Sequence, residues 1–105
     1  MRRGEVYRFR VPKGSGHEQQ GPRYGVVVQA DEFLPRSVVL VAPTSSRARA
    51  ASFRPIIDVG GEETRILVEQ LGAVDVRRLG KRMQLLDAVA MWAVDDALTT
   101  VLGLH

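Results

Sequence analysis

Residues 25–42 read GVVVQADEFLPRSVVLVA, and two runs rich in β-branched residues within this stretch, 25–29 and 38–42, decide the fold. β-branched side chains favour extended strands, and short unbroken apolar runs are typical of central strands in a buried sheet. Each run ends at a polar residue or a proline, and residues 31–35 between them predict a turn that can include one helical turn. The stretch therefore predicts two buried central strands.

More strands are predicted on either side of this pair. Residues 5–11 alternate apolar residues with arginine, which is the period-2 pattern of a strand with one face in water. Residues 56–59 and 64–71 have strand character and are joined by a Gly-Gly turn, and strand character resumes at 73–75 after a bulge expected at Gly72. The chain is therefore expected to hold about six short strands.

The C-terminal segment has a helical pattern instead. From Asp87 to Leu102 the apolar residues recur at steps of three and four, with Asp87 a suitable N-cap and Gly103 a suitable stop. Trp92 in this helix is expected in the core or against a partner. Short strands followed by one helix in 105 residues predict a mainly β (α+β) fold. We expect one domain, 1–105, that forms a small, strongly bent antiparallel barrel with the helix packed on it.

The amino-acid composition excludes several kinds of functional site. The chain has no cysteine, and its only histidines are His17 and His105, so neither a disulfide framework nor a zinc site is expected. The chemistry must then be free of metal or rely on carboxylates, and we expect no cofactor. The longest apolar runs are far below the roughly 20 residues of a membrane span, and the N-terminus lacks the apolar core of a secretory signal. We expect a cytoplasmic protein that does not engage a membrane.

The charge of the chain is unevenly distributed. Residues 1–55 hold ten basic and four acidic residues, a balance of +6, whereas the remainder has a balance of −3. Most of the basic residues are arginine, whose planar guanidinium suits bidentate contacts to phosphate. This pattern points to a polyanion such as nucleic acid, although a solvated arginine-rich surface has the same composition. Charge alone leaves both interpretations open.

Two loop regions hold the candidate functional side chains. The first is the glycine-rich segment 14–21, which runs into Arg23, and the second begins with the hydroxyl residues 44–46 and continues to residue 51 as a basic surface loop. Loops at strand ends on a rigid barrel are common places for a site. Polar loop residues also serve simply to satisfy the local backbone, so these loops by themselves predict no particular chemistry.

Four segments follow one another along nearly the whole sequence: RGEVY at 3–7, GHEQQGPR at 16–23, APTS at 42–45 and VEQLGAVDVRRL at 68–79. In type and order they resemble the segments of the MazF/PemK family of toxin endoribonucleases. Each segment alone is common, because glycine loops and β-branched strands are frequent. Four of them in the right order and spacing are specific.

The resemblance implies a small SH3-like antiparallel barrel of the MazF/PemK/CcdB type with a C-terminal helix. It also implies a homodimer, sequence-selective cleavage of single-stranded RNA, and inhibition by a small, partly disordered antitoxin peptide. The family's catalytic pair is the arginine that closes the loop motif and a hydroxyl at the end of the third strand, here Arg23 and Thr44. The family usually has one residue between the proline and the threonine, whereas Thr44 directly follows Pro43, so Ser45 is a second candidate. Tyr24 replaces the proline that usually follows the arginine.

These residue types suit metal-free cleavage of RNA, whose own 2′-hydroxyl is the nucleophile. A guanidinium donates two parallel hydrogen bonds to phosphate oxygens on which charge develops, which gives Arg23 an electrostatic role. Glu18 is a candidate base, whereas His17 is expected to contact RNA or stay solvated. For Phe53 a core position is as good an interpretation as base stacking. The other residues expected at the RNA are polar, basic or aromatic: Gln19, Arg47, Arg49, Phe53, Gln70 and Arg78.

Two further functions are compatible with the same fold. A related barrel poisons gyrase by gripping that protein, and a barrel that had lost catalysis would only bind RNA. A gyrase poison is expected to depend on an aromatic C-terminal end, whereas this sequence ends Gly103-Leu104-His105. The combination of Arg23, Glu18 and a hydroxyl at 44 or 45 therefore favours the ribonuclease.

Overall fold

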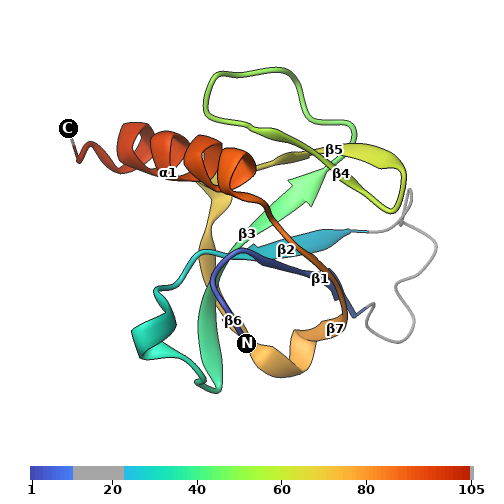
Figure 1. Cartoon of the computed structure of the whole chain (residues 1–105), viewed down its shortest axis with the longest axis vertical. Helices are drawn as coiled ribbons and strands as arrows, with labels where there is room; N and C mark the ends of the chain where they lie inside the picture. The colour runs from blue at the N-terminus through green and yellow to red at the C-terminus, as the bar shows by residue number, and fades with distance from the viewer. Residues whose placement is uncertain (11–22, 105) are drawn as a thin grey trace.

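The protein folds as a curled antiparallel sheet with a helix packed across it (Figure 1). The computed structural model describes residues 1–10 and 23–104, so the long loop expected between the first two strands lies outside the described residues. In chain order, with η marking a 3₁₀ helix, the elements are β1 Glu5–Phe9, β2 Tyr24–Val27, η2 Asp31–Phe33, β3 Val38–Ser45, β4 Ile56–Val59, β5 Glu62–Ile66, η3 Val68–Gln70, β6 Gly72–Asp75, η4 Val76–Arg78, β7 Leu79–Leu85 and α1 Ala88–Leu102.

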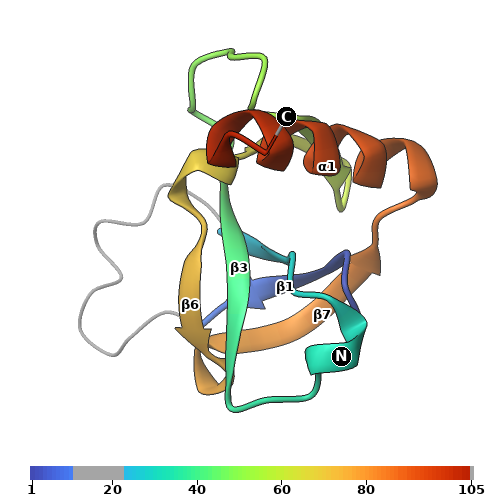
Figure 2. The same ribbon diagram turned by 90° about the vertical axis from the view of Figure 1, so that its left-hand side faces the viewer.

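Strand β3 is the centre of the sheet. The strand order is β4-β5-β3-β2-β1-β7, with β6 also bonded to β3, and all the pairs are antiparallel. On one edge β3 is bonded first to β6 and then to β5, and Figure 2 shows β3 and β6 side by side. The two edge strands of the sheet, β4 and β7, approach each other: the Gln84 side-chain amide of β7 donates to the Asp58 carbonyl of β4 at 2.9 Å. The sheet therefore curls almost into a closed barrel, which confirms the predicted fold class.

Both faces of this sheet are buried, because neighbouring residues of a strand contribute to two different apolar clusters. Val6 and Ala42 belong to the main core with residues of α1, whereas Tyr7 and Val41, next to them in sequence, belong to a second cluster. Side chains alternate between the faces of a strand, so the two clusters lie on opposite faces. The main core comprises Val6, Tyr24, Val26, Val28, Ala42, Ile57, Val59, Ile66, Val68, Leu86, Val94 and Ala97, and the second cluster forms around Val39, Val41 and Leu79.

The third predicted strand is longer than the sequence indicated. It was expected to end at Ala42 before the proline, but β3 continues through Pro43 to Ser45. Proline has no amide hydrogen to give to a ladder. At this position the strand passes from partner β6 to partner β5, and the Pro43 carbonyl still accepts from the Leu67 amide at 2.8 Å. Thr44 and Ser45 are therefore strand residues, and the basic loop begins after them.

The expectations for residues 64–82 were partly wrong. The expected strand over 64–71 ends at Ile66, because Val68–Gln70 form the 3₁₀ helix η3. Gly72 begins β6 in regular register with β3, and the register shifts occur between β1 and β7 instead. Strand β7 was not predicted, since its sequence LGKRMQL has too many polar residues for a clear alternating pattern. The turn at 60–61 is confirmed, with positive φ at both glycines.

Helix α1 has the predicted boundaries. The Asp87 side chain caps it by accepting from the Ala90 amide at 2.8 Å, and Gly103 ends it in the left-handed conformation. Trp92 is 76% exposed, which excludes the core position and leaves the partner-facing interpretation as a prediction. No helix among the described residues is long and apolar enough to cross a membrane.

Candidate active site

The ends of β1, β2, β3 and β5 place two rows of residues side by side across the sheet. In the first row, Arg8 pairs with Tyr24, and Thr44 pairs with Ile66. The link between Tyr24 and Thr44 follows from the register of the next pair, Gly25 opposite Pro43. The row thus runs from β1 through β2 and β3 to β5, with adjacent strands about 4.8 Å apart.

The second row lies one residue further towards the loops. Ser45 is directly opposite Arg65 of β5. On the other side, continuing the β2–β3 register sets Arg23 opposite Ser45, and the Phe9 amide donates to the Arg23 carbonyl at 3.0 Å. The observed contacts are therefore Phe9 with Arg23 and Ser45 with Arg65, and the β2–β3 register, extended two residues past its last pair, connects them into one row.

The two rows face opposite sides of the sheet. Thr44 is 1% exposed and lies on the side of the main core, like its partner Ile66. Its hydroxyl oxygen accepts a hydrogen bond from the Tyr24 backbone amide at 3.3 Å. Directly opposite residues share a face and sequence neighbours do not, so Ser45 and Arg23 lie together on the other face. Of the two hydroxyls that the sequence left open, Ser45 is the one on the face of Arg23.

Arg23 has a fixed backbone and an exposed side chain. Its carbonyl is held by β1, and two residues later Gly25 allows a close approach on the same face. A Cβ added to Gly25 would lie 2.5 Å from Val41 Cγ1 and 2.9 Å from Phe9 Cζ, so only glycine lets the Phe9 ring cover this part of β2. The guanidinium of Arg78 stands over the other part of that ring, 5.6 Å from its centroid. The packing of Phe9 therefore brings a further arginine towards the face that carries Arg23.

Arg65 is a site residue that the sequence did not single out. It alternates with the buried residues Thr64 and Ile66 and is itself half-buried on the outer face of β5, directly opposite both Ser45 and Ile56. It makes no hydrogen bond or ion pair with any other described residue. The strand pattern places Arg65 on the face away from Ile66, but only the observed register shows that Ser45 is its neighbour.

The basic loop after β3 is tied back to the barrel at both ends. Near its start, Ser45 Oγ accepts from the Arg47 amide at 3.3 Å. Near its end, the Arg54 guanidinium bonds Glu69 through Nε, at 2.9 Å, and Nη2, and donates through Nη1 to the Arg49 carbonyl at 3.1 Å. The bonds from Arg54 are the main reason that the pKa of Glu69 lies below its ordinary range, despite partial burial that raises it. Arg54 and Glu69 thus fix the loop in which Arg47 and Arg49 are exposed.

The other predicted RNA contacts are spread around this face. Gln70 is exposed in η3, next to Glu69. Phe53 packs against the main core, with Arg54 5.7 Å from its ring centroid, which favours the core interpretation that the sequence had left open. His17, Glu18 and Gln19 lie outside the described residues.

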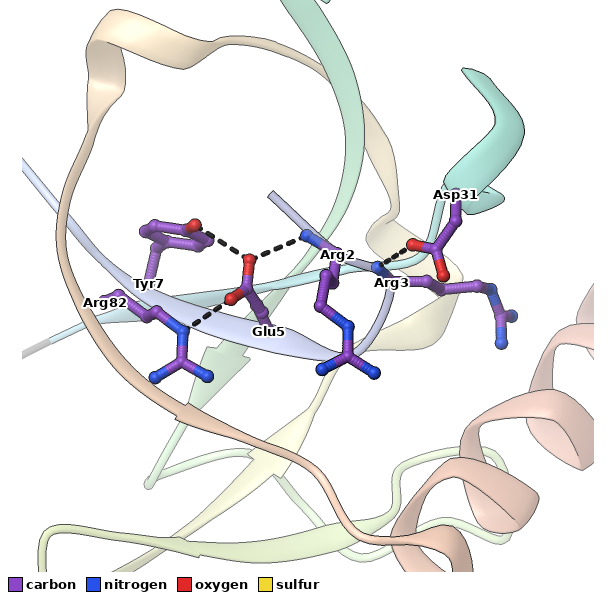
Figure 3. Close-up of polar contacts among 6 residues, drawn as sticks. All are labelled: Arg2, Arg3, Glu5, Tyr7, Asp31 and Arg82. Carbon is purple, nitrogen blue, oxygen red and sulfur yellow. Dashed lines mark hydrogen bonds and ion pairs between the residues drawn. The ribbon is translucent and has the colours of Figure 1, made fainter. Parts of the chain in front are cut away.

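A second polar cluster surrounds Glu5 at the start of β1 (Figure 3). Glu5 is 6% exposed, and its carboxylate accepts from the Arg2 amide at 2.7 Å, from the Tyr7 hydroxyl at 2.9 Å and from Arg82 Nε. Burial raises the pKa of Glu5, but these hydrogen bonds and the Arg82 charge outweigh burial and leave the pKa below its ordinary value. The cluster joins the N-terminal segment to β7, and we assign it a role in stability.

Comparisons with known sequences identify the family. The profile of the family described as PemK-like, MazF-like toxin of type II toxin-antitoxin system matches residues 2–102. A provisionally named toxin of Mycobacterium tuberculosis is 41% identical over 104 residues, which cover 97% of both chains. Endoribonuclease MazF of Staphylococcus saprophyticus is 31% identical over 114 aligned positions, which cover 100% of this chain and 93% of the relative.

Solved structures agree on the fold. A MazE-MazF structure from Deinococcus radiodurans (form II) superposes with a TM-score of 0.78 at 21% identity, covering 100% of this chain and 97% of the other. An endoribonuclease in complex with its cognate antitoxin from a mycobacterial species gives a TM-score of 0.76 at 17% identity, with 100% and 97% coverage. At these identities the likeness concerns the fold alone. Because the family profile spans nearly the whole sequence, the chain belongs to the PemK-like, MazF-like toxins of type II toxin-antitoxin systems.

Proposed function

We propose that this toxin is an endoribonuclease that cleaves single-stranded RNA at selected sequences without a metal ion. The Staphylococcus saprophyticus relative is named as an endoribonuclease, and so is the mycobacterial protein in the antitoxin complex. The observation that supports the proposal is that Arg23 and Ser45 lie at adjacent strand ends and share the face of the second cluster, through Phe9 and Val41. That face offers a guanidinium and a hydroxyl to one phosphate.

In the proposed reaction the RNA supplies its own nucleophile. The 2′-oxygen forms a bond to phosphorus as the bond from phosphorus to the 5′-oxygen breaks, giving a 2′,3′-cyclic phosphate and a 5′-hydroxyl. The 2′-hydroxyl loses a proton, which Glu18 is proposed to accept, and the departing 5′-oxygen takes a proton from water. Arg23 and Ser45 donate hydrogen bonds to the non-bridging oxygens, which carry most charge in the transition state. A guanidinium keeps its proton at neutral pH, so the proposed role of Arg23 is electrostatic.

Burial favours Ser45 over Thr44 as the hydroxyl of the site. Thr44 is closed off from solvent, and its oxygen already accepts from Tyr24. Ser45 is half-buried on the face of Arg23, and its hydroxyl hydrogen is not engaged by the bond that its oxygen accepts from Arg47. We therefore assign phosphate contact to Ser45 and a structural role to Thr44.

The partners proposed for this face are an RNA strand and an antitoxin. The exposed or half-exposed arginines 47, 49 and 78, with Gln70, are proposed to hold the RNA on either side of the cleaved bond, together with His17 and Gln19. A homodimer would double the basic surface, and a partly disordered antitoxin peptide would compete with RNA for it. This assembly would act in the cytoplasm, where its RNA substrate is found.

One assay tests this function against its rivals. Purified protein is incubated with a single-stranded RNA oligonucleotide in excess chelator, and the product ends are identified by mass spectrometry. We expect cleavage that leaves a 2′,3′-cyclic phosphate and requires a 2′-hydroxyl at the cleaved nucleotide. Cleavage of an oligonucleotide with deoxyribose at that position would refute the mechanism. Binding of RNA without cleavage would support a non-catalytic barrel, and inhibition of gyrase would support the binding toxin.

A further inference from the structure

Arg65 occupies the side of Ser45 that Arg23 leaves open. Strand β3 lies between β2 and β5; Ser45 is directly opposite Arg65 across one edge, and across the other the β2–β3 register, extended two residues past its last pair Gly25–Pro43, leads to Arg23. All three side chains share one face of the sheet, because directly opposite residues of antiparallel strands point the same way. With adjacent strands about 4.8 Å apart, the two arginine Cα atoms are about 10 Å apart with Ser45 midway.

The charge of Arg65 has no counterion within the described part of the chain. Ion pairs there engage other arginines, namely Arg3, Arg54, Arg77 and Arg82. Arg65 is half-buried in the middle of a paired strand, opposite the side chain of Ile56. Its stem is thereby held at the sheet, and a long basic side chain in this situation keeps its charged end in water. A fixed stem with an unpaired guanidinium is suited to an anion that arrives from solution.

We propose that Arg65 is a second guanidinium ligand of the phosphate that is cleaved, an inference that rests on the proposed ribonuclease function. A phosphate centred over Ser45 presents two non-bridging oxygens, one towards β2 and one towards β5. Arg23 donates to the first and Arg65 to the second, with the Ser45 hydroxyl between them. Both oxygens gain negative charge as the 2′-oxygen attacks, so both contacts strengthen in the transition state and lower its energy. Arg65 takes no part in proton transfer.

This arrangement predicts a specific kinetic effect. A ligand of the reacting phosphate that strengthens in the transition state changes kcat, whereas a contact to a flanking phosphate changes KM alone. Replacing Arg65 should therefore lower kcat by about a hundredfold, the lower end of the range found when one preorganised donor is removed. A role limited to the stability of the strand would change neither constant once the folded fraction is equal.

The experiment compares wild type, Arg65→Gln, Arg65→Ala and the control Arg36→Gln in steady-state cleavage of one RNA oligonucleotide. Arg36 is exposed just before β3, and the seven steps from Val38 to Ser45 place it roughly 23 Å or more from the site, so the control removes the same charge elsewhere. Thermal melting sets the folded fraction of each variant. We expect the control to keep the wild-type kcat and the Arg65 variants to lose it.

Chemical rescue gives a second readout that a structural role would not move. Guanidinium ion at millimolar concentration should restore part of kcat to Arg65→Ala, and methylammonium at the same concentration should not, because only guanidinium donates two parallel hydrogen bonds. If wild type cleaves RNA and Arg65→Gln has an unchanged kcat, the inference is wrong while the proposed function stands. If wild type does not cleave RNA, the proposed function itself fails.

Discussion

The backbone amide of Tyr24 donates its hydrogen bond to the buried hydroxyl of Thr44, at the point where β2 enters the sheet beside the row of Arg23. This contact replaces a ladder bond between the two strands, because the amide meets a side-chain oxygen instead of a carbonyl. It gives Thr44 a structural task that does not require contact with substrate. Substitutions at the two neighbouring hydroxyl residues, Thr44 and Ser45, are therefore predicted to have opposite effects on stability and on activity.

Thr44→Val should reduce stability and spare activity. The change keeps the shape of the side chain but leaves the Tyr24 amide buried without a partner, which costs about 1–3 kcal/mol. Chemical denaturation should show this loss, and cleavage by the folded fraction should stay within about twofold of wild type. Thr44→Ser, which keeps the oxygen, is the matched control and should recover part of the lost stability. A catalytic Thr44 would instead lower kcat in a variant that is fully folded.

Ser45→Ala should have the reverse effect. Ser45 lies at the end of β3, and the bond its oxygen accepts from Arg47 is exposed, so its loss should cost no more than about 1 kcal/mol. The loss of a hydrogen-bond donor to the developing charge should lower kcat about tenfold to a hundredfold. Ser45→Thr keeps the hydroxyl and should retain most of the activity. Equal kcat values for Ser45→Ala and wild type would show that Ser45 is not the hydroxyl that contacts the phosphate and would favour Thr44 for that role.

Arg23→Ala should be the most damaging single change to cleavage. Removing a bidentate donor to the transition state should cost on the order of 3 kcal/mol, or about a hundredfold or more in kcat. Arg23 holds β1 only through its backbone carbonyl, so the melting temperature should hardly move. Single-turnover kinetics with saturating protein would measure the chemical step directly. A fully active Arg23→Ala protein would refute the assignment of the catalytic pair.

The sequence predicted most of the strands and the helix of this fold, but not where β3 ends or which residue of β5 lies opposite its end. The β-branched runs and the capped helix were correctly predicted, because their signals are local and periodic. The hydroxyl could not be assigned, because a proline normally ends a strand, and at Pro43 the change of partner from β6 to β5 makes its missing amide harmless. Arg65 was missed for a related reason, since its position beside Ser45 depends on the register of two strands that are 20 residues apart in sequence. Long-range register has no local signal.

The Glu5 cluster predicts how the protein responds to acid. The pKa of Glu5 in the folded state lies below its ordinary value of 4.5, so the carboxylate contributes stability above about pH 4.5 and loses it as the pH falls through the lower folded value. Glu5→Gln should be less stable than wild type at pH 7 by about 2 kcal/mol, because a buried side chain loses its charge-assisted hydrogen bonds. The difference should shrink below pH 4, as measured by urea denaturation across pH.

Asp75 supplies the control for that experiment. Its carboxylate pairs with Arg77, whose side chain is 88% exposed, and the hydrogen bonds from Arg77 lower the pKa of Asp75 to about 2. Water and salt screen an exposed pair, so Asp75→Asn should change stability little at any pH despite this shift. If Glu5→Gln and Asp75→Asn behave alike, the burial of Glu5 does not matter and the stabilising role of the cluster is wrong.

The last prediction concerns assembly, and Trp92 provides the probe. On α1, Met91 and Leu98 pack against the main core, whereas Trp92 and Val89 are exposed. We expect a homodimer in light scattering at micromolar concentration, with its RNA affinity falling steeply as salt rises because arginine contacts displace counterions. An acidic antitoxin peptide should displace RNA from the basic surface of the dimer.

The single tryptophan, Trp92, reports any partner that covers α1, because its emission shifts to the blue when it is covered. Trp92→Ala should leave the melting temperature nearly unchanged. A monomer in light scattering, or simultaneous binding of antitoxin and uncleaved RNA, would contradict this assembly.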